Sequence, residues 1–546
     1  MEKRAILAAV LIAALLILYQ ILFPPVPPPP PPPESAREQK AAPVQEAPAP
    51  LPPPLKPLSQ AAPPGRVVTV ETPLYRARVE SEGGKVIEWV IHYRGDKAMV
   101  LKDLVGSKGL SLHRDGAAQP LAFEVSPERL VLGAGRPRGD LTLVGADGYG
   151  VRVVESLTFS AQDYRLEVHV KIENRHSVAQ SAEVLLPWFT QGKWPEGQGE
   201  QFQGQRPTRV VRLLPHGVQR EEFDKVSETA AAGEWIGLES EWYIAALIPR
   251  SPGFKLVTQK GPDGQVEIAL KAVPPTLAPG QSWEGRALVY LGPKEYDRLR
   301  AVGVGLEQTI HFGELFYLPF LRMEWLAVPI LWLMNFVYRY IPNYGVAIIL
   351  LTVLTKIIFY PLTLKSMASM KAMQTLQPQV NALRAKYQKD PQRLQRETME
   401  LYRKHKVNPM GGCLPMVIQI PIFYALYLVF SLSVELQNAA FLCFGKLFGV
   451  ALWICDLSQY DPTYILPILM GISMFIQQKM TPTVGDPRQA KIMLFMPVLF
   501  TFMFLNLPSG LVLYWFVSNV LQILQQSYMD HGAKPAGKES REGKRQ

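Results

Sequence analysis

The sequence predicts a multi-domain protein in which a β domain outside the cytoplasm precedes an α-helical membrane region. Residues up to about 310 are polar and rich in Gly and Pro, whereas residues from about 315 to 530 are mostly apolar. Short runs with a period of two residues fill the first part, and long apolar runs fill the second. These contrasts favour two different kinds of domain within the 546 residues.

The first element, residues 1–23, is predicted to be a transmembrane anchor. Lys3 and Arg4 precede an uncharged run of about 19 residues that ends at Phe23, which is long enough to span a bilayer. A cleaved signal peptide is the alternative, but no small-x-small cleavage site follows the run. The two basic residues would hold the N-terminus in the cytoplasm.

Residues 24–64 are predicted to be a linker. The segment begins PPVPPPPPPP and is rich in Pro and Ala, so it cannot bury a hydrophobic core. Such a composition is typical of a semi-rigid polyproline spacer. A ligand for an SH3-type domain is the alternative to a plain tether.

Residues 65–310 are predicted to form a large antiparallel β domain of the sandwich type. In YRLEVHVKIEN, alternate residues make one apolar face: Tyr164, Leu166, Val168, Val170 and Ile172. In FKLVTQKGPDGQVEIALKA, the turn residues Pro262, Asp263 and Gly264 predict a hairpin. The orientation of the anchor places this domain outside the cytoplasm.

The apolar half is predicted to hold one interfacial helix and five spans. Residues 322–341 carry apolar bulk, Trp residues and Arg339, and Pro342 marks a break. They are interpreted as an amphipathic helix in the outer interface, with a full span as the alternative. The spans are predicted at 343–364, 412–434, 464–478, 492–507 and 510–529.

Basic residues between the spans indicate their orientation. The loop 365–408 is rich in Lys and Arg and is therefore predicted to be cytoplasmic. Lys446 is the one basic residue in the loop 435–463, which is placed outside. The tail 530–546 is basic and is placed inside. With the anchor, these loops predict six spans with both termini in the cytoplasm.

The basic loop 365–408 is predicted to be a cytoplasmic helical hairpin. Its first apolar stripe has helical spacing and comprises Met373, Leu376, Val380, Leu383 and Tyr387. Asp390 and Pro391 interrupt it, because Pro suits the start of a helix and not its interior. The hairpin could simply pack on itself with a solvated basic face. It could also contact ribosomal RNA or anionic lipid, and the two interpretations are compatible.

Lys356 is the one charged residue inside any predicted span. A charge at bilayer depth costs at least ~2.5–3.5 kcal/mol. Lys356 lies ~9 Å along the helix from the level of Leu362, too far for its stem to reach the interface comfortably. Because no acidic residue in another span can pair with it, a hydrated cavity is predicted. The alternative is an ammonium group bonded to carbonyls in a packed bundle.

Three long motifs resemble the YidC membrane protein insertases of Gram-negative bacteria: KVNPMGGCLPMVIQIPIFYALY, ALWICDLSQYDPTYILPILMGISMFIQQKMTP, and KIMLFMPVLF followed by LPSGLVLYWFVSNVLQILQQ. YLGPKEYDRL resembles the end of their periplasmic domain. The resemblance implies a five-span core with a preceding anchor in the inner membrane, and a periplasmic β-supersandwich-like domain. It also implies a water-filled groove that is open to the cytoplasm and to lipid.

The resemblance implies three residues of that groove, and polar residues at span depth suggest others. Lys356 occupies the position of the family's groove charge, where Arg is commoner; the charge is kept but the bidentate fork is lost. Gln419 and Trp515 would face the substrate. Four more polar residues at span depth are predicted to hold water in the groove: Thr352, Thr355, Ser518 and Asn519.

The implied function is that of an insertase and folding chaperone for nascent membrane proteins, acting alone or with the Sec translocon. Partitioning of apolar segments into lipid would drive insertion, so no nucleotide, metal, cofactor or covalent chemistry is expected. The chain has no GxxxxGK[ST] motif. The expected partners are the bilayer and the ribosome, the latter through 365–408 and 530–546; no DNA is expected.

The sequence argues against two other functions. A transporter or channel could use the single cation to bind an anion, but the sequence lacks inverted repeats of broken helices and a second intramembrane charge. The β domain could be an enzyme, because supersandwiches also occur in sugar mutarotases, but no HExxH, GxSxG or Cys-His cluster is present.

Cys443 and Cys455 fall in the loop that is placed outside, where a disulfide is permitted. The apolar segment between them could instead dip into the membrane interface. The sequence leaves their pairing open.

Overall fold

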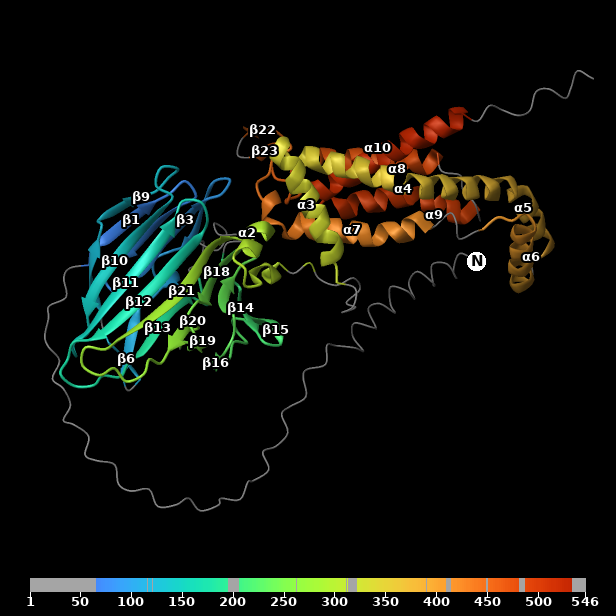
Figure 1. Cartoon of the computed structure of the whole chain (residues 1–546). Coiled ribbons are helices and arrows are strands. Elements are labelled where there is room, and N and C mark those ends of the chain that lie inside the picture. The colour runs from blue at the N-terminus through green and yellow to red at the C-terminus, as the bar shows by residue number, and fades with distance from the viewer. Residues whose placement is uncertain are drawn as a thin grey trace, which may run out of the picture. The chain divides into compact units, whose positions relative to one another are not determined.

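The computed structural model describes residues 65–532, apart from 115, 120, 195–205, 262, 311, 313–321, 389, 409–413, 448–449 and 481–486 (Figure 1). The predicted anchor 1–23 and linker 24–64 lie outside the described residues, as do residues 533–546 of the predicted tail.

The first part of the described chain is built from three sheets of mainly antiparallel strands (Figure 1). The nine-stranded sheet has the order β15 (Gly217–Glu222), β14 (Arg209–Leu214), β17 (Trp235–Glu239), β18 (Tyr243–Pro249), β21 (Ser282–Pro293), β12 (Arg165–Asn174), β11 (Val151–Ser160), β10 (Arg138–Ala146), β8 (Ala122–Ser126). The seven-stranded sheet has β16 (Thr229–Ala231), β19 (Phe254–Lys260), β20 (Val266–Ala272), β13 (Glu183–Thr190), β6 (Ser111–Arg114) and β7 (Ala117–Gln119), with β5 (Val105–Ser107) also paired to β13. The five-stranded sheet has β4 (Asp96–Val100), β3 (Lys85–His92), β2 (Tyr75–Glu80), β1 (Val67–Glu71) and β9 (Arg129–Val131).

The period of two residues predicted the inner face of the large sheet correctly. All five apolar residues of the Tyr164–Ile172 stripe are buried, and Leu166 of β12 is paired with Val289 of β21. The predicted hairpin is also confirmed: β19 pairs with β20, and Gly264 adopts φ +75° in the turn. The domain ends in two short helices, α2 (Tyr296–Ala301) and η2 (Leu306–Thr309).

One inward position of β11 carries an acid instead of an apolar residue. Glu155 alternates with the buried Val153 and Leu157, so the strand directs its carboxyl group into the interior. Gly84, with φ +66°, has no side chain where the Glu155 carboxyl lies. Burial raises the pKa of Glu155 from 4.5 to about 8, so the carboxyl group is mostly protonated at neutral pH.

We expect Glu155→Gln to stabilise the β domain at pH 8. The folded state holds the Glu155 proton more tightly than the unfolded state, so this residue's contribution to stability is present below pH 4.5 and is lost as the pH rises towards 8. At pH 8 the substitution should raise the free energy of unfolding by at most about 4–5 kcal/mol. Near-UV circular dichroism melts at pH 5 and pH 8 measure it, with Glu167→Gln on the exposed face of β12 as the control. An unchanged pH dependence in Glu155→Gln would contradict the assignment.

The second part of the described chain is mainly helical (Figure 1). Its helices are α3 (Glu324–Tyr340), α4 (Tyr344–Thr375), α5 (Gln377–Lys386), α6 (Pro391–Lys404), α7 (Leu414–Leu432), α8 (Ile465–Met480), α9 (Pro487–Phe504) and α10 (Ser509–Gly532), with the short η5 (Val434–Leu436) after α7. Among the described helices, α4 alone is both long and apolar enough to cross a membrane; the apolar parts of α7, α8 and α9 are shorter.

Helix α4 runs well past the predicted span 343–364. Its 32 residues rise ~48 Å, so a hydrocarbon core of ~30 Å would accommodate only part of the helix and would leave its C-terminal part outside. There it meets α5 and α6, which lie at the end of the bundle opposite the start of α4 (Figure 1). The interior of this hairpin is a small cluster of Met373, Leu376, Val380 and Tyr402, and Asp390 caps α6 by accepting from the backbone N–H of Arg393.

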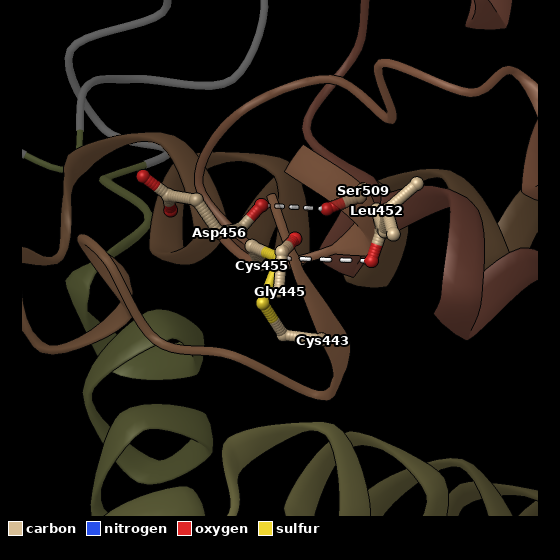
Figure 2. The surroundings of a disulfide bond; sticks show 6 residues. All are labelled: Cys443, Gly445, Leu452, Cys455, Asp456 and Ser509. Carbon is tan, nitrogen blue, oxygen red and sulfur yellow. Dashed lines mark hydrogen bonds between the residues drawn. A yellow bond between two sulfur atoms is a disulfide. The ribbon is translucent and has the colours of Figure 1, made fainter. Parts of the chain in front are cut away.

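At the other end of the bundle, β22 (Leu442–Leu447) and β23 (Val450–Ile454) form a separate two-stranded hairpin. Cys443 and Cys455 form a disulfide across it (Figure 2). The structure thus settles the alternative that the sequence left open in favour of pairing.

Candidate functional site

The site is built around Lys356 on α4. Asn343 fixes the start of this helix, because its side-chain oxygen accepts from the backbone N–H groups of Gly345 (2.9 Å) and Val346 (3.2 Å). Lys356 lies 12 residues after Tyr344, ~18 Å along the helix axis, well inside the apolar part of α4. Its side chain is partly exposed.

The described partner of the Lys356 ammonium group is a neutral amide. Lys356 Nζ donates to Gln522 Oε1 of α10 at 3.0 Å, and α10 packs against α4. Gln522 Nε2 lies 3.9 Å from Sδ of Met367, which is 11 residues, or about three turns, further along α4 than Lys356. None of the ion pairs formed between described residues involves Lys356, so its positive charge is not neutralised within this part of the chain.

Gln522 is not among the residues predicted for the site. An acidic partner is the expected one for an ammonium group, but the oxygen of a neutral amide also accepts a hydrogen bond from it. A signal was present, because Gln522 lies four residues after the predicted site residue Ser518 and therefore shares its face of the helix.

The two threonines near Lys356 direct their hydroxyl protons to their own helix. Thr352 Oγ1 donates to the carbonyl oxygen of Ile348 at 2.6 Å, and Thr355 Oγ1 donates to that of Thr352 at 2.8 Å. Thr352 is fully buried and Thr355 is partly buried. Thr352 therefore lies inside the bundle, on another face than the exposed Ile357 and Ile358.

Asn519 lies in a second polar contact, towards α8. Its Nδ2 donates to Ser473 Oγ at 3.1 Å, and Ser473 in turn donates to the carbonyl oxygen of Met470. Ser518 is also buried. Helix α10 thus presents polar groups to both α4 and α8, and Ser473 is a second residue that the sequence analysis missed.

Trp515 belongs to an aromatic cluster and not to the contact around Lys356. Its ring centroid lies 4.8 Å from that of Phe423 on α7 and 4.9 Å from that of Phe504 on α9, both with edge-to-face geometry. Gln419 lies one turn before Phe423 on α7, and its side chain is exposed. Gln419 therefore lies on the same side of α7 as Phe423, which contacts Trp515, while none of the described contacts joins Gln419 or Trp515 to Lys356.

Helix α9 presents a broad apolar surface beside this cluster. Its exposed side chains, spaced at helical intervals, are Leu494, Phe495, Val498, Leu499, Phe502 and Met503. On its inner side α9 approaches α8 closely, since a side chain at Gly471 of α8 would meet Thr501 Oγ1 at 2.1 Å. The exposed face of α9 has the chemistry of a surface that contacts lipid tails.

Comparisons with known proteins agree with this architecture. A family model described as the YidC periplasmic domain matches residues 67–333, and one described as the 60Kd inner membrane protein matches residues 336–536. The chain is 41% identical over 483 residues to a membrane protein insertase YidC of Syntrophus aciditrophicus, covering 85% of each protein. It is 37% identical over 480 residues to that of Geobacter sulfurreducens, covering 85% of this chain and 86% of the other. A crystal structure of an active YidC insertase with its first transmembrane domain resolved is 20% identical, with a TM-score of 0.37, and covers 86% of this chain and 95% of that one.

Proposed function

The chain belongs to the YidC family of membrane protein insertases, inner-membrane proteins with a periplasmic β-rich domain and a helical membrane region, and on this premise we propose that Lys356 attracts the acidic tails of nascent membrane proteins into a hydrophilic groove. The observation that carries the proposal is the contact between Lys356 and the neutral Gln522. This contact orients the ammonium group without cancelling its charge.

The proposed topology has six spans with both termini in the cytoplasm. The periplasmic domain leads through α3 to the start of α4, so the N-terminal end of α4 faces the periplasm. The basic α5–α6 hairpin at the other end of α4 then faces the cytoplasm, as the positive-inside bias requires. The predicted spans 412–434, 464–478, 492–507 and 510–529 fall on α7, α8, α9 and α10, whose pairwise packing supports a bundle.

The strength of the proposed attraction follows from Coulomb's law. In a partly hydrated groove with an effective dielectric near 20, a carboxylate ~6 Å from the Lys356 ammonium gains roughly 3 kcal/mol before desolvation is subtracted. This energy is enough to hold a tail part-way across the membrane and weak enough to release it.

Polar and apolar parts of the substrate would take different routes. The tail would occupy the polar side of α4 and α10, near Lys356, Gln522 and Ser518. The apolar segment would move along the exposed face of α9 into the lipid. Because partitioning into lipid supplies the free energy, the mechanism needs no nucleotide and no covalent chemistry.

The basic regions 365–408 and 530–546 are proposed to contact the ribosome during synthesis of the substrate. The α5–α6 hairpin supports this role, because its apolar residues pack inside it and its Lys and Arg residues remain for an anionic partner. We propose that the protein acts in this way alone or with the Sec translocon.

Reconstitution tests the proposed function. Purified protein in liposomes should protect the tail of a small single-span substrate from external protease, without added nucleotide. The matched control is a liposome that contains Lys356→Glu. Flux of a small anion without tail protection would contradict the insertase and favour a transporter.

A further inference from the structure

The proposed mechanism assigns no role to the β22–β23 hairpin. Residues 438–455 contain no acidic residue, and Lys446 is their one basic residue. Phe444 is 69% exposed, and its ring is stacked on that of Trp453 with the two centroids 6.1 Å apart. Leu442 is also exposed. The hairpin thus presents apolar side chains outside the core of the bundle.

Two contacts fix the position of the hairpin along the membrane normal. Asn343, the residue that caps α4, donates from Nδ2 to the carbonyl oxygen of Phe441 at 3.1 Å. The Phe441 ring packs on Gly345, where an added Cβ would meet it at 2.0 Å. The base of the hairpin therefore sits at the first turn of the clearest membrane-spanning helix.

The chain that leaves the second strand, at the same base of the hairpin, is tied to α10. Ser509 Oγ donates to the carbonyl oxygen of Asp456 at 2.9 Å (Figure 2), and the backbone N–H of Gly510 donates to that of Leu457 at 2.9 Å. Because α4 and α10 both begin at this level, the hairpin would emerge at the outer boundary of the hydrocarbon in the proposed topology, on which this inference rests. Figure 1 shows it at the end of the bundle where α4 begins.

Interactions beyond strand pairing are needed to stabilise the hairpin as a separate element. A two-stranded hairpin alone is at best marginally stable in water. Here the disulfide between Cys443 and Cys455 closes it, and the backbone N–H of Phe441 donates to the carbonyl oxygen of Ile454 beside that bridge. The closed ring holds Phe444 and Trp453 together on the same element.

From these observations we infer that the disulfide-closed hairpin is a membrane anchor that inserts Phe444 into the outer leaflet of the bilayer, while the partly buried Trp453 supports the Phe444 ring from the protein side. Aromatic side chains are favoured at the boundary between headgroups and acyl chains. Helix α3, which ends just before α4 begins, carries a row of exposed aromatic side chains of the same character: Trp332, Phe336 and Tyr340. A lipid surface fits this element because it is apolar and aromatic, carries no acidic residue, and is held at the depth of the interface.

Spin-label accessibility in proteoliposomes tests this inference. The full chain, in vesicles of phosphatidylethanolamine and phosphatidylglycerol, carries p-acetylphenylalanine with a nitroxide at position 444, which leaves both cysteines in place. The measured quantity is the ratio of collision rates with oxygen, which concentrates in lipid, and with a water-soluble nickel chelate. Ile358 on α4 (59% exposed) provides the lipid reference, and Val273 after β20 (62% exposed) provides the water reference.

We expect the ratio at position 444 to exceed that at position 273 by at least about threefold and to approach that at position 358. Mass spectrometry after alkylation verifies that each labelled protein keeps its disulfide. A ratio equal to that at position 273 would overturn the inference. Low collision rates with both reagents would also overturn it, because protein and not lipid would then cover Phe444.

Discussion

Lys356→Glu is expected to slow the insertion of substrates with acidic tails by at least about tenfold, because an attraction of roughly 3 kcal/mol becomes a repulsion. The Gln522 amide can turn its nitrogen to the new carboxylate, so the contact between α4 and α10 can be kept while the sign of the charge changes. The measurement is the rate of tail protection in proteoliposomes. We expect a neutral tail of the same length to be slowed much less.

Lys356→Arg is the matched control for this result. It keeps the charge, and Arg is the commoner residue that the family resemblance implies at this position. We expect its insertion rates to stay within about threefold of the unmodified protein for both kinds of tail. Equal and severe loss in Lys356→Arg and Lys356→Glu would show that the shape of the Lys356 side chain matters more than its charge.

Gln522→Glu is expected to have the second largest effect. The new carboxylate would lie at the position of Gln522 Oε1, 3.0 Å from Lys356 Nζ, and would form an ion pair with it. An ion pair at this distance cancels most of the field that a substrate tail experiences. Insertion of acidic tails should therefore fall about as far as in Lys356→Ala, although Lys356 itself is unchanged.

Gln522→Met separates charge from packing in that experiment. Met has a similar length and removes the hydrogen bond while leaving the ammonium group charged. The preference for acidic tails should persist in Gln522→Met and disappear in Gln522→Glu. Loss of the preference in both variants would mean that the orientation of Lys356, and not its net charge, controls insertion.

The β domain was predictable because its strands have one buried and one exposed face. The alternation of Tyr164 to Ile172 is set by the pleat of a strand, so it needs no knowledge of distant residues. The order of the nine strands in the large sheet was not predictable in this way. The pairing of β12 with β21 joins residues more than a hundred positions apart. The local sequence pattern of a strand does not indicate which distant strand will pair with it.

At the candidate site, the sequence singles out Lys356 but not the residues that contact it. Lys356 stands out because a charge in an apolar run is costly. Its partner Gln522 does not stand out, since amides are less costly at that depth and several occur near the end of the chain. Trp515 was expected at the substrate and lies in a cluster with Phe423 and Phe504; packing of aromatic rings from three helices depends on the assembled bundle. The Cys443–Cys455 bridge likewise depends on the pairing of β22 with β23.

The most direct test of the central claim is the dependence of insertion rate on tail charge in Lys356→Ala. A series of substrates differs only in the number of Asp residues in the translocated tail, and each rate is compared with that of the unmodified protein. We expect acidic tails to lose their advantage in Lys356→Ala while neutral tails insert at nearly the original rate. If acidic and neutral tails are slowed by the same factor, the attraction does not exist, and Lys356 must instead keep the groove open.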